Sequence, residues 1–230
     1  MRKYLTAFLF AVLLPGAALA ADPAPRTIVL VRHGQYIADP AIDEAIGPPL
    51  SPLGLAQARL AGDALAGLGG FDALYVSPMT RARDTAASIG TEIGRQDFAV
   101  IDDIAECTPP TRRSEITKDD APEDLAACAA RLDAVFARLF VPAEGRAARD
   151  MVVCHGNVIR YLVTRALGVD TQAWLEMSVR HASITVIRVE ADGRFKVIAV
   201  GDAGHIPPGL HTGATGDPER TLSNNGVRDS

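Results

Sequence analysis

Four basic side chains in this sequence stand where they could act together on a phosphate group. Arg32 and His33 directly follow one short apolar run, Arg81 comes soon after a second, and His155 directly follows a third. Guanidinium groups form paired hydrogen bonds with phosphate oxygens and keep their charge at every relevant pH. A neutral imidazole carries a lone pair that can attack phosphorus. These residue types at these positions predict phosphoryl-transfer chemistry.

Each of the four has its own expected role. Arg32 and Arg81 would hold the equatorial oxygens of the phosphoryl group, whose negative charge repels an attacking group. His33 would attack phosphorus, because neighbouring arginines disfavour the charged form of its ring and leave the lone pair available. His155 would donate a hydrogen bond to the transferring group. We therefore expect catalysis through a covalent phosphohistidine.

The leaving oxygen also needs a proton, which a carboxyl group with a raised pKa commonly supplies. Glu106 is the candidate acid, because it follows an expected strand and turn. Its nearby competitors are Asp102, Asp103 and Glu115. Three further residues beside the basic positions are expected to line the substrate pocket: Gln35, Tyr36 and Asn157.

Apolar runs of strand length alternate along the chain with segments of helical period. The expected strands span residues 27–31, 73–76, 98–101, 151–154, 184–189 and 195–200, and the expected helices span residues 52–68, 80–94, 122–140 and 157–167. This alternation predicts an α/β fold, a three-layer sandwich with a mainly parallel central sheet. Ligands of such sheets bind beyond the carboxyl ends of the strands, so the four basic residues should converge there.

Several consecutive motifs carry a resemblance to a known family. They are Arg32-His33-Gly34-Gln35-Tyr36, Ser77-Pro78-Met79-Thr80-Arg81-Ala82, His155-Gly156-Asn157-Val158-Ile159-Arg160-Tyr161, Ser183-Ile184-Thr185 and Gly201-Asp202-Ala203-Gly204. From about Thr27 to Pro208 the chain resembles the histidine phosphatase superfamily, the phosphoglycerate mutase-like proteins. Within it, the chain is similar to the branch that contains the mitochondrial protein serine/threonine phosphatase. The resemblance implies a phosphoglycerate mutase-like fold, a nucleophile at His33 and the acid at Glu106.

Three functions are compatible with these residues. The first is an exported phosphomonoesterase that acts outside the cytoplasm on phosphoserine or phosphothreonine proteins, or on a small or cell-envelope phosphate ester. The second is a phosphoglycerate mutase-type phosphotransferase, although Gln35 and Tyr36 stand where mutases usually continue with Glu and then Ser or Thr. The third is a non-catalytic scaffold of the same fold, which should have lost at least one of the four basic residues. Because all four are present, the sequence favours the phosphomonoesterase.

Composition limits the expected partners. The chain has 230 residues, with 28 acidic against 23 basic residues and a formal charge of -5, which offers no footprint for nucleic acid. A phosphorylated small molecule or a phosphoprotein is the expected substrate, and the sequence predicts no oligomeric state. We expect neither a metal nor an organic cofactor, because the sequence contains no consistent metal-ligand spacing and no nucleotide-binding motif.

Residues 1–20 have the pattern of a secretory signal peptide, with two basic residues, an apolar run and the ending Ala18-Leu19-Ala20. Cleavage would release a secreted or periplasmic protein, whereas an uncleaved segment would anchor the chain to a membrane. Residues 21–208 would then form the histidine phosphatase domain. Residues 209–230, rich in Gly, Pro and polar types, are expected to be a flexible C-terminal tail.

The cysteines and the remaining histidines receive no functional role from the sequence. The odd number of cysteines cannot all pair internally, and we expect buried, inert thiols that form no disulfide framework. They are Cys107, Cys128 and Cys154. The late histidines show no consistent metal spacing and are expected at the surface or at the rim of the site. They are His181, His205 and His211.

Overall fold

The computed structural model describes residues 21–43 and 45–213. Its strands are β1 (Pro23–Ala24), β2 (Arg26–Arg32), β3 (Ala73–Val76), β4 (Ala99–Val100), β5 (Ala143–Glu144), β6 (Ala148–Cys154), β7 (Ile184–Val189) and β8 (Phe195–Asp202). Its α-helices are α1 (Pro52–Ala66), α2 (Thr80–Ile93), α3 (Pro122–Leu139) and α4 (Gly156–Leu167). Its short 3-10 helices are η1 (Asp102–Ile104), η2 (Thr171–Glu176) and η3 (Pro208–Leu210).

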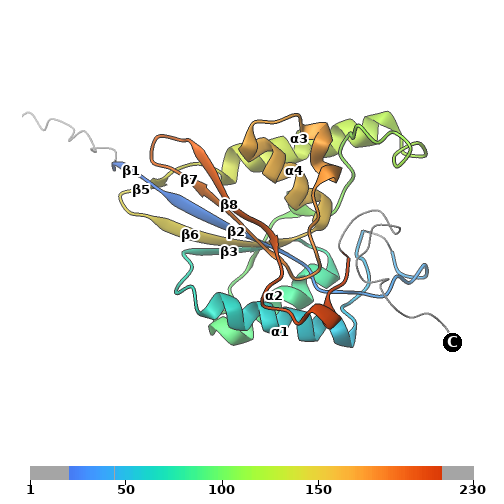
Figure 1. The fold of residues 1–230 in the computed structure, drawn as a ribbon, viewed down its shortest axis with the longest axis horizontal. Helices are drawn as coiled ribbons and strands as arrows, with labels where there is room; N and C mark the ends of the chain where they lie inside the picture. Colours follow the sequence, from blue (N-terminus) through green and yellow to red (C-terminus); the bar gives the residue numbers. More distant parts are fainter. Residues whose placement is uncertain (1–20, 44, 214–230) are drawn as a thin grey trace, which may run out of the picture.

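Six strands form the central sheet, in the order β4-β3-β6-β2-β7-β8. The strands from β4 to β2 run parallel, β7 is antiparallel to β2, and β8 is antiparallel to β7. Helices α1 and α2 lie on one side of this sheet, and α3 and α4 lie on the other (Figure 1). The predicted three-layer α/β sandwich with a mainly parallel sheet is therefore confirmed.

The central strand β2 separates two hydrophobic cores. Ile28 and Leu30 pack into the core that includes residues of α3 and α4, whereas Val29 and Val31 pack into the core with α1 and α2. Because successive side chains of a strand point to opposite faces, a strand covered on both sides must be apolar at every position. This requirement explains why β2 is visible in the sequence as a continuous apolar run.

Most helices and strands begin and end close to the predicted residues. The start of β6 differs, because its first residues include a charged side chain. Strand β3 has the predicted bounds, and α2 ends where Gly94 caps it in the left-handed conformation, with φ 70°. Strand β6 begins at Ala148, three residues before the predicted start. Its early residues include Asp150, a buried carboxylate that forms an ion pair with Arg26 of the adjacent strand. Because Asp150 is charged, the hydropathy pattern does not identify the first residues of β6 as part of a buried strand.

The cysteine prediction is wrong for one pair. Cys107, in the loop after η1, forms a disulfide with Cys128 of α3, and their Cα atoms lie 5.8 Å apart. Cys154 at the end of β6 is free and buried, as expected. The helical period placed Cys128 on the buried face of α3, but the path of the loop that carries Cys107 depends on tertiary contacts that this period does not encode.

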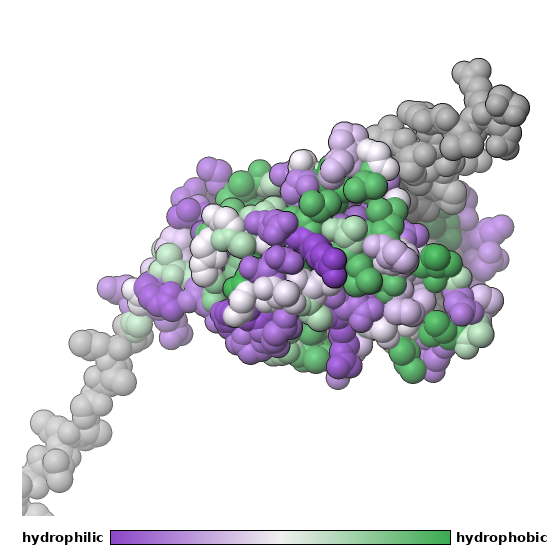
Figure 2. All heavy atoms as spheres, turned by 90° about the horizontal axis from the view of Figure 1, so that it is seen from below, coloured by the Kyte–Doolittle hydropathy of each residue, from purple (hydrophilic) through white to green (hydrophobic). Residues whose placement is uncertain are grey.

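The chain ends fall partly outside the described residues. The predicted signal peptide, residues 1–20, and residues 214–230 lie outside them. Residues 209–213 of the predicted tail lie within them, and Nε2 of Gln57 donates to the carbonyl oxygen of Leu210 and to Oγ1 of Thr212. Hydrophilic and hydrophobic side chains are interspersed on the face seen in Figure 2. Within residues 21–43 and 45–213, no helix is long and apolar enough to cross a membrane.

Candidate active site

The carboxyl ends of three adjacent parallel strands bring the predicted catalytic residues together. Arg32 is the last residue of β2 and pairs in register with Cys154, the last residue of β6. The residues that come next in the two strands, His33 and His155, therefore lie side by side, with ring centroids 5.1 Å apart. Strand β3 pairs with the other side of β6 and ends just before Ser77. The expected convergence at this edge of the sheet is observed.

The hydrogen bonds of His33 fix the tautomer of its ring. Nδ1 lies 2.8 Å from the carbonyl oxygen of Gly34, which can only accept a hydrogen bond, so Nδ1 carries the proton. In a neutral ring this leaves the lone pair on Nε2, which accepts a hydrogen bond from Nε of Arg81 at 3.2 Å. Burial, followed by the charges of His155 and Arg32, holds the pKa of His33 well below its ordinary value. His33 is thus a neutral imidazole with its lone pair directed at a cation.

Arg81 lies in the first turn of α2, directly after the loop that follows β3. Its side chain is buried, and its guanidinium carbon lies 4.9 Å from the centre of the Tyr36 ring. A guanidinium that stacks on an aromatic ring keeps its N–H groups free for hydrogen bonds in its own plane. Tyr36 therefore orients Arg81, and its ring also approaches His33 edge-on at 5.5 Å.

Arg32 is held mainly by carbonyl oxygens of late loops. Its Nη1 donates to the carbonyl oxygens of Val179 and Gly213, each at 2.6 Å. Its Nε is buried and has no hydrogen-bond partner among the described residues. Burial and the charge of Arg160 lower the pKa of Arg32 to about 10, which still leaves it charged at neutral pH. An unpartnered guanidinium N–H beside the nucleophile is suited to a phosphate oxygen.

His155 has one ring nitrogen bound and the other unpartnered. Its Nε2 lies 2.7 Å from Oγ of Ser77, which also accepts a hydrogen bond from the backbone N–H of Met79. If the Ser77 hydroxyl donates to Nε2, the proton of the neutral ring is on Nδ1. Nδ1 is buried with no partner among the described residues, and burial keeps the pKa of His155 well below its ordinary value. The ring can therefore offer one N–H to a bound group.

Glu106 is the acidic residue that lies among these cations. Burial raises the pKa of its carboxyl group, while the charges of Arg32, Arg81 and Arg160 act in the opposite direction. Its Oε1 is buried and finds no hydrogen-bond partner in the described part of the chain. A carboxyl group in such surroundings can hold a proton and release it to a leaving oxygen.

The competing carboxylates are committed elsewhere. Asp103 forms an ion pair with Arg138, and Glu115 forms one with Arg113 at the surface. Asp102 and Asp103 line a surface cavity together with Arg138 and Arg26, and Arg26 begins β2, whereas His33 follows the other end of that strand.

The three residues predicted to line the pocket take different positions. Tyr36 lies against Arg81, as described above. The side chain of Gln35 is tied to the cap of α1 through Ser51 and to the backbone of Tyr36. Asn157 donates from Nδ2 to the carbonyl oxygen of Cys107 and accepts from Arg160. The structure thus brings Tyr36 into the cationic cluster, while Gln35 and Asn157 brace the loops around it.

His181 was expected at the surface or rim, and this expectation is wrong. Only 8% of the residue is exposed, and its ring centroid lies 5.3 Å from that of His33. Its Nε2 lies 3.0 Å from Nη2 of Arg32, and its Nδ1 lies 2.9 Å from Oγ1 of Thr212. Because Arg32 can only donate, Nε2 accepts and Nδ1 carries the proton, which fits a pKa lowered to about 2 by burial and then by Arg32.

Two more residues of the site received no role from the sequence. Arg160 of α4 is buried, and it is one of the three arginines whose charge acts on Glu106. Ser77 partners His155. Both stand inside the motifs that carried the family resemblance, which is the signal that could have found them. His181 had a weaker signal, because it comes just before β7 and that strand pairs antiparallel with β2.

Comparison with known proteins identifies the relatives of this chain. Residues 28–110 and 102–202 match the family described as the histidine phosphatase superfamily, branch 1. The mitochondrial serine/threonine-protein phosphatase Pgam5 of Caenorhabditis elegans is 34% identical over 191 residues, which cover 80% of this chain and 66% of that protein. Its human counterpart is 33% identical over 199 residues, which cover 80% and 65%. The chain thus spans just under two thirds of the length of these relatives.

Solved structures agree with the fold. A mycobacterial glucosyl-3-phosphoglycerate phosphatase superposes with a TM-score of 0.59 at 22% identity, covering 77% of this chain and 99% of that one. A phosphoglycerate mutase from Plasmodium falciparum gives a TM-score of 0.55 at 24% identity, covering 80% and 95%. The predicted phosphoglycerate mutase-like fold is confirmed.

The predicted secreted or periplasmic location is contradicted by these comparisons. The curated relatives from worm, mouse and human are all mitochondrial proteins. The prediction relied on a basic start followed by an apolar run, and such a pattern describes the hydropathy of a segment without identifying the machinery that recognises it.

Proposed function

This chain belongs to the histidine phosphatase superfamily, and we propose that it is a phosphatase that hydrolyses phosphate monoesters by way of a phosphohistidine at His33. One observation carries the proposal. Nδ1 of His33 is committed as a donor to Gly34, so the lone pair of the neutral ring is on Nε2, beside Arg81. A histidine that is buried only for packing has no requirement for arginines and a second histidine around the nitrogen that carries its lone pair.

The first step transfers the phosphoryl group to the protein. The lone pair of His33 Nε2 forms a bond to phosphorus as the ester P–O bond breaks, and Glu106 gives its proton to the leaving oxygen. Arg32, Arg81 and His155 share the charge of the equatorial oxygens, as preorganised donors do in other phosphoryl transfers. Arg81 must turn from Nε2 toward the phosphate for this step, since it occupies the nitrogen that attacks.

The second step returns the site to its starting state. Water attacks phosphorus, the N–P bond breaks, and the proton of the water passes to the Glu106 carboxylate. Inorganic phosphate leaves, His33 regains its lone pair, and Glu106 is again protonated. The raised pKa of Glu106 suits a group that alternates between acid and base near neutral pH.

We propose phosphoserine and phosphothreonine side chains of proteins as the substrates. The names of the curated relatives support this class, since the worm and human proteins are serine/threonine-protein phosphatases. A phosphoserine phosphatase from Entamoeba histolytica has a similar fold, at 18% identity. A phosphorylated small molecule is therefore the competing class, and the same catalytic residues would serve either.

Phosphate release from three compounds tests the proposed function. The purified protein is incubated with a phosphoserine peptide, with free phosphoserine and with 3-phosphoglycerate. We expect inorganic phosphate from the peptide at a kcat/KM at least about tenfold above that for free phosphoserine, because a protein phosphatase also binds the flanking chain. Equal rates with free phosphoserine would contradict the protein substrate, and isomerisation of 3-phosphoglycerate without phosphate release would support a mutase instead.

A further inference from the structure

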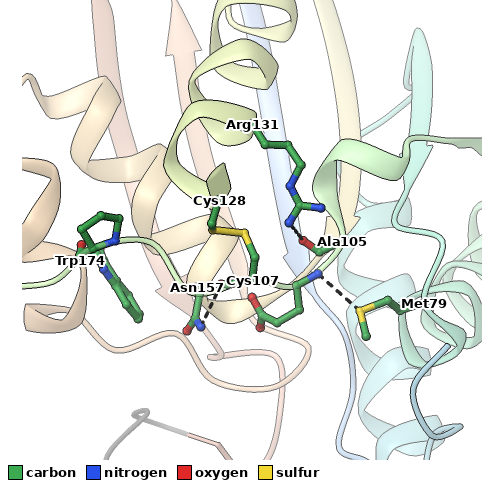
Figure 3. The surroundings of a disulfide bond; sticks show 9 residues. Met79, Ala105, Cys107, Cys128, Arg131, Asn157 and Trp174 are labelled. Atoms are coloured by element: carbon green, nitrogen blue, oxygen red, sulfur yellow. Dashed lines mark hydrogen bonds between the residues drawn. A yellow bond between two sulfur atoms is a disulfide. The ribbon is translucent and has the colours of Figure 1, made fainter. Parts of the chain in front are cut away.

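The residue next to the proposed acid is covalently attached to a helix on the far side of the site. Cys107 directly follows Glu106 and is bonded to Cys128 of α3, 21 residues further along the chain (Figure 3). One turn later on the same helix, Nη2 of Arg131 donates to the carbonyl oxygen of Ala105 at 3.0 Å. Helix α3 therefore holds the residues on both sides of Glu106, through a disulfide on one side and a hydrogen bond on the other.

The loop that carries Glu106 is held by a few hydrogen bonds and by the disulfide, and at its end Nε1 of Trp174 donates to the carbonyl oxygen of Pro110 at 3.0 Å. Residues 105–110 adopt no regular secondary structure, and Pro109 and Pro110 have no backbone N–H to donate. The backbone N–H of Glu106 points to a weak acceptor, the sulfur of Met79, at 3.4 Å. Asn157 donates to the carbonyl oxygen of Cys107 at 3.2 Å. The disulfide is the strongest link between this loop and the rest of the molecule.

The Glu106 carboxyl group depends on this backbone for its position. Its Oε1 has no hydrogen-bond partner among the described residues, so no side chain holds that oxygen in place. A displacement of about 1 Å at a reacting group can reduce a rate by about 10². Arg32 ends β2, His33 follows it and Arg81 lies on α2, so all three are outside the segment that the disulfide holds. Loosening the loop would therefore disturb the acid and leave the nucleophile in place.

We propose that the Cys107–Cys128 disulfide is a positioning element for the acid Glu106, so that its reduction slows phosphoryl transfer to the protein from alkyl esters and spares that transfer from aryl esters. This inference rests on the proposed function, in which Glu106 protonates the leaving group. The reduction is a thiol–disulfide exchange: a dithiol gives up two electrons and two protons, the Sγ–Sγ bond breaks, and two cysteine thiols and a cyclic disulfide result.

The selectivity follows from the leaving groups. An alkoxide is a strong base and needs the proton of Glu106 as the P–O bond breaks, whereas p-nitrophenolate leaves without help. Cys128 is only 4% exposed and Cys107 is half-buried, so complete reduction is verified by counting thiols. A disulfide that only stabilised the fold would act on both substrates equally.

The test compares oxidised and dithiothreitol-reduced protein on glycerol 2-phosphate and on p-nitrophenyl phosphate. Intact mass after alkylation first counts the thiols in each form. We expect kcat/KM for glycerol 2-phosphate to fall by about tenfold or more on reduction and kcat/KM for p-nitrophenyl phosphate to stay within about twofold, because kcat/KM reports the steps up to departure of the leaving group and excludes the second step, in which Glu106 acts as base on either substrate. Equal losses of kcat/KM on both substrates, no loss on either, or three alkylated thiols instead of one in the oxidised form would overturn the proposal.

Three variants assign the effect to this bond. The double variant Cys107→Ala/Cys128→Ala should have the kinetics of the reduced protein, and dithiothreitol should not change them. Dithiothreitol should change the kinetics of Cys154→Ala as it changes those of the wild type. The variant Glu106→Gln distinguishes failure of the disulfide proposal from failure of the proposed function, in which Glu106 protonates the leaving group. If oxidised Glu106→Gln shows no leaving-group-selective loss, the acid assignment fails; if it shows that loss while reduction has no effect on the wild type, only the disulfide proposal fails.

Discussion

Nε of Arg81 donates a hydrogen bond to Nε2 of His33 over 3.2 Å. The pairing of a guanidinium with a neutral imidazole is possible because the other ring nitrogen, Nδ1, gives its proton to the carbonyl oxygen of Gly34. The same contact would have to break when a phosphoryl group arrives, and the freed N–H would then meet a phosphate oxygen. This hydrogen bond therefore orients His33 before the reaction. It also keeps Nε of Arg81 close to the position where it would donate to a phosphate oxygen in the transition state.

Replacing Arg81 by alanine should reduce kcat/KM by about 10²–10³, the usual loss for one preorganised donor. The exposed Arg83, two residues further along α2, offers a matched control, because Arg83→Ala removes the same charge from the same helix. Steady-state kinetics with p-nitrophenyl phosphate measures both. A comparable loss in Arg83→Ala would mean that net charge matters rather than the contact with His33.

Ser77→Ala should lower kcat about tenfold, because Nε2 of His155 would lose its partner at 2.7 Å and the ring could place its proton on either nitrogen. Ser88→Ala is the control, since the Ser88 hydroxyl donates to the carbonyl oxygen of Asp84 on α2. Equal kinetics for Ser77→Ala and wild type would show that the proton of His155 is not fixed by this contact.

His181 should act through Arg32. His181→Phe keeps the ring but removes the acceptor that holds Nη2 of Arg32 at 3.0 Å, and we expect KM to rise about tenfold as the guanidinium loses its fixed orientation. His181→Asn supplies an amide oxygen as acceptor and should stay within about threefold of the wild type. If both variants behave alike, the ring of His181 contributes by packing and not by orienting Arg32.

The buried histidines should make the protein less stable in mild acid. The pKa values of His33, His155 and His181 are all lowered in the folded chain, the last to about 2. As the pH falls below the ordinary value of 6.5, the unfolded chain takes up protons that the folded chain does not, so the free energy of unfolding falls. Each such group contributes a slope of up to about 1.4 kcal/mol per pH unit.

One group opposes this trend, since the raised pKa of Glu106 favours the folded chain as the pH falls toward 4.5. With three buried histidines, and with the half-buried His205 whose pKa is also lowered, against one carboxyl group, we expect the urea midpoint to decrease from pH 7 to pH 5. The His181→Asn variant should show a shallower decrease. A midpoint that rises or stays constant over this range in the wild type would contradict the buried neutral histidines.

The sequence predicted the sheet and the central residues of the site because both leave strong local signals. Residues 28–31 of β2 and 151–154 of β6 are covered on both faces and are apolar, and the chemistry follows them closely as His33 and His155. His181 escaped because its position depends on the antiparallel pairing of β7 with β2, and on a turn in which Ala182 adopts a positive φ of 52°. Neither feature has a local signal in the apolar pattern.

The sequence did not predict the disulfide, for a related reason. The odd count of cysteines implied that they could not all pair, and we expected buried, inert thiols; Cys154 is such a thiol, but Cys107 and Cys128 form a disulfide. Cys107 lies in a loop without regular structure, and its approach to Cys128 follows from the packing of that loop against α3 and α4. Such contacts join segments far apart in the chain.

The account depends most on the phosphorylation of His33 at Nε2. Rapid quenching of the protein with a phosphorylated substrate, followed at alkaline pH by mass spectrometry of the peptide that contains residue 33, measures this directly. A phosphoramidate is labile in acid and stable in base, the reverse of an acyl phosphate. We predict a base-stable phosphate on His33 during turnover, and neither label nor turnover in His33→Ala; phosphate on another residue, or continued turnover by His33→Ala, would contradict the proposed mechanism.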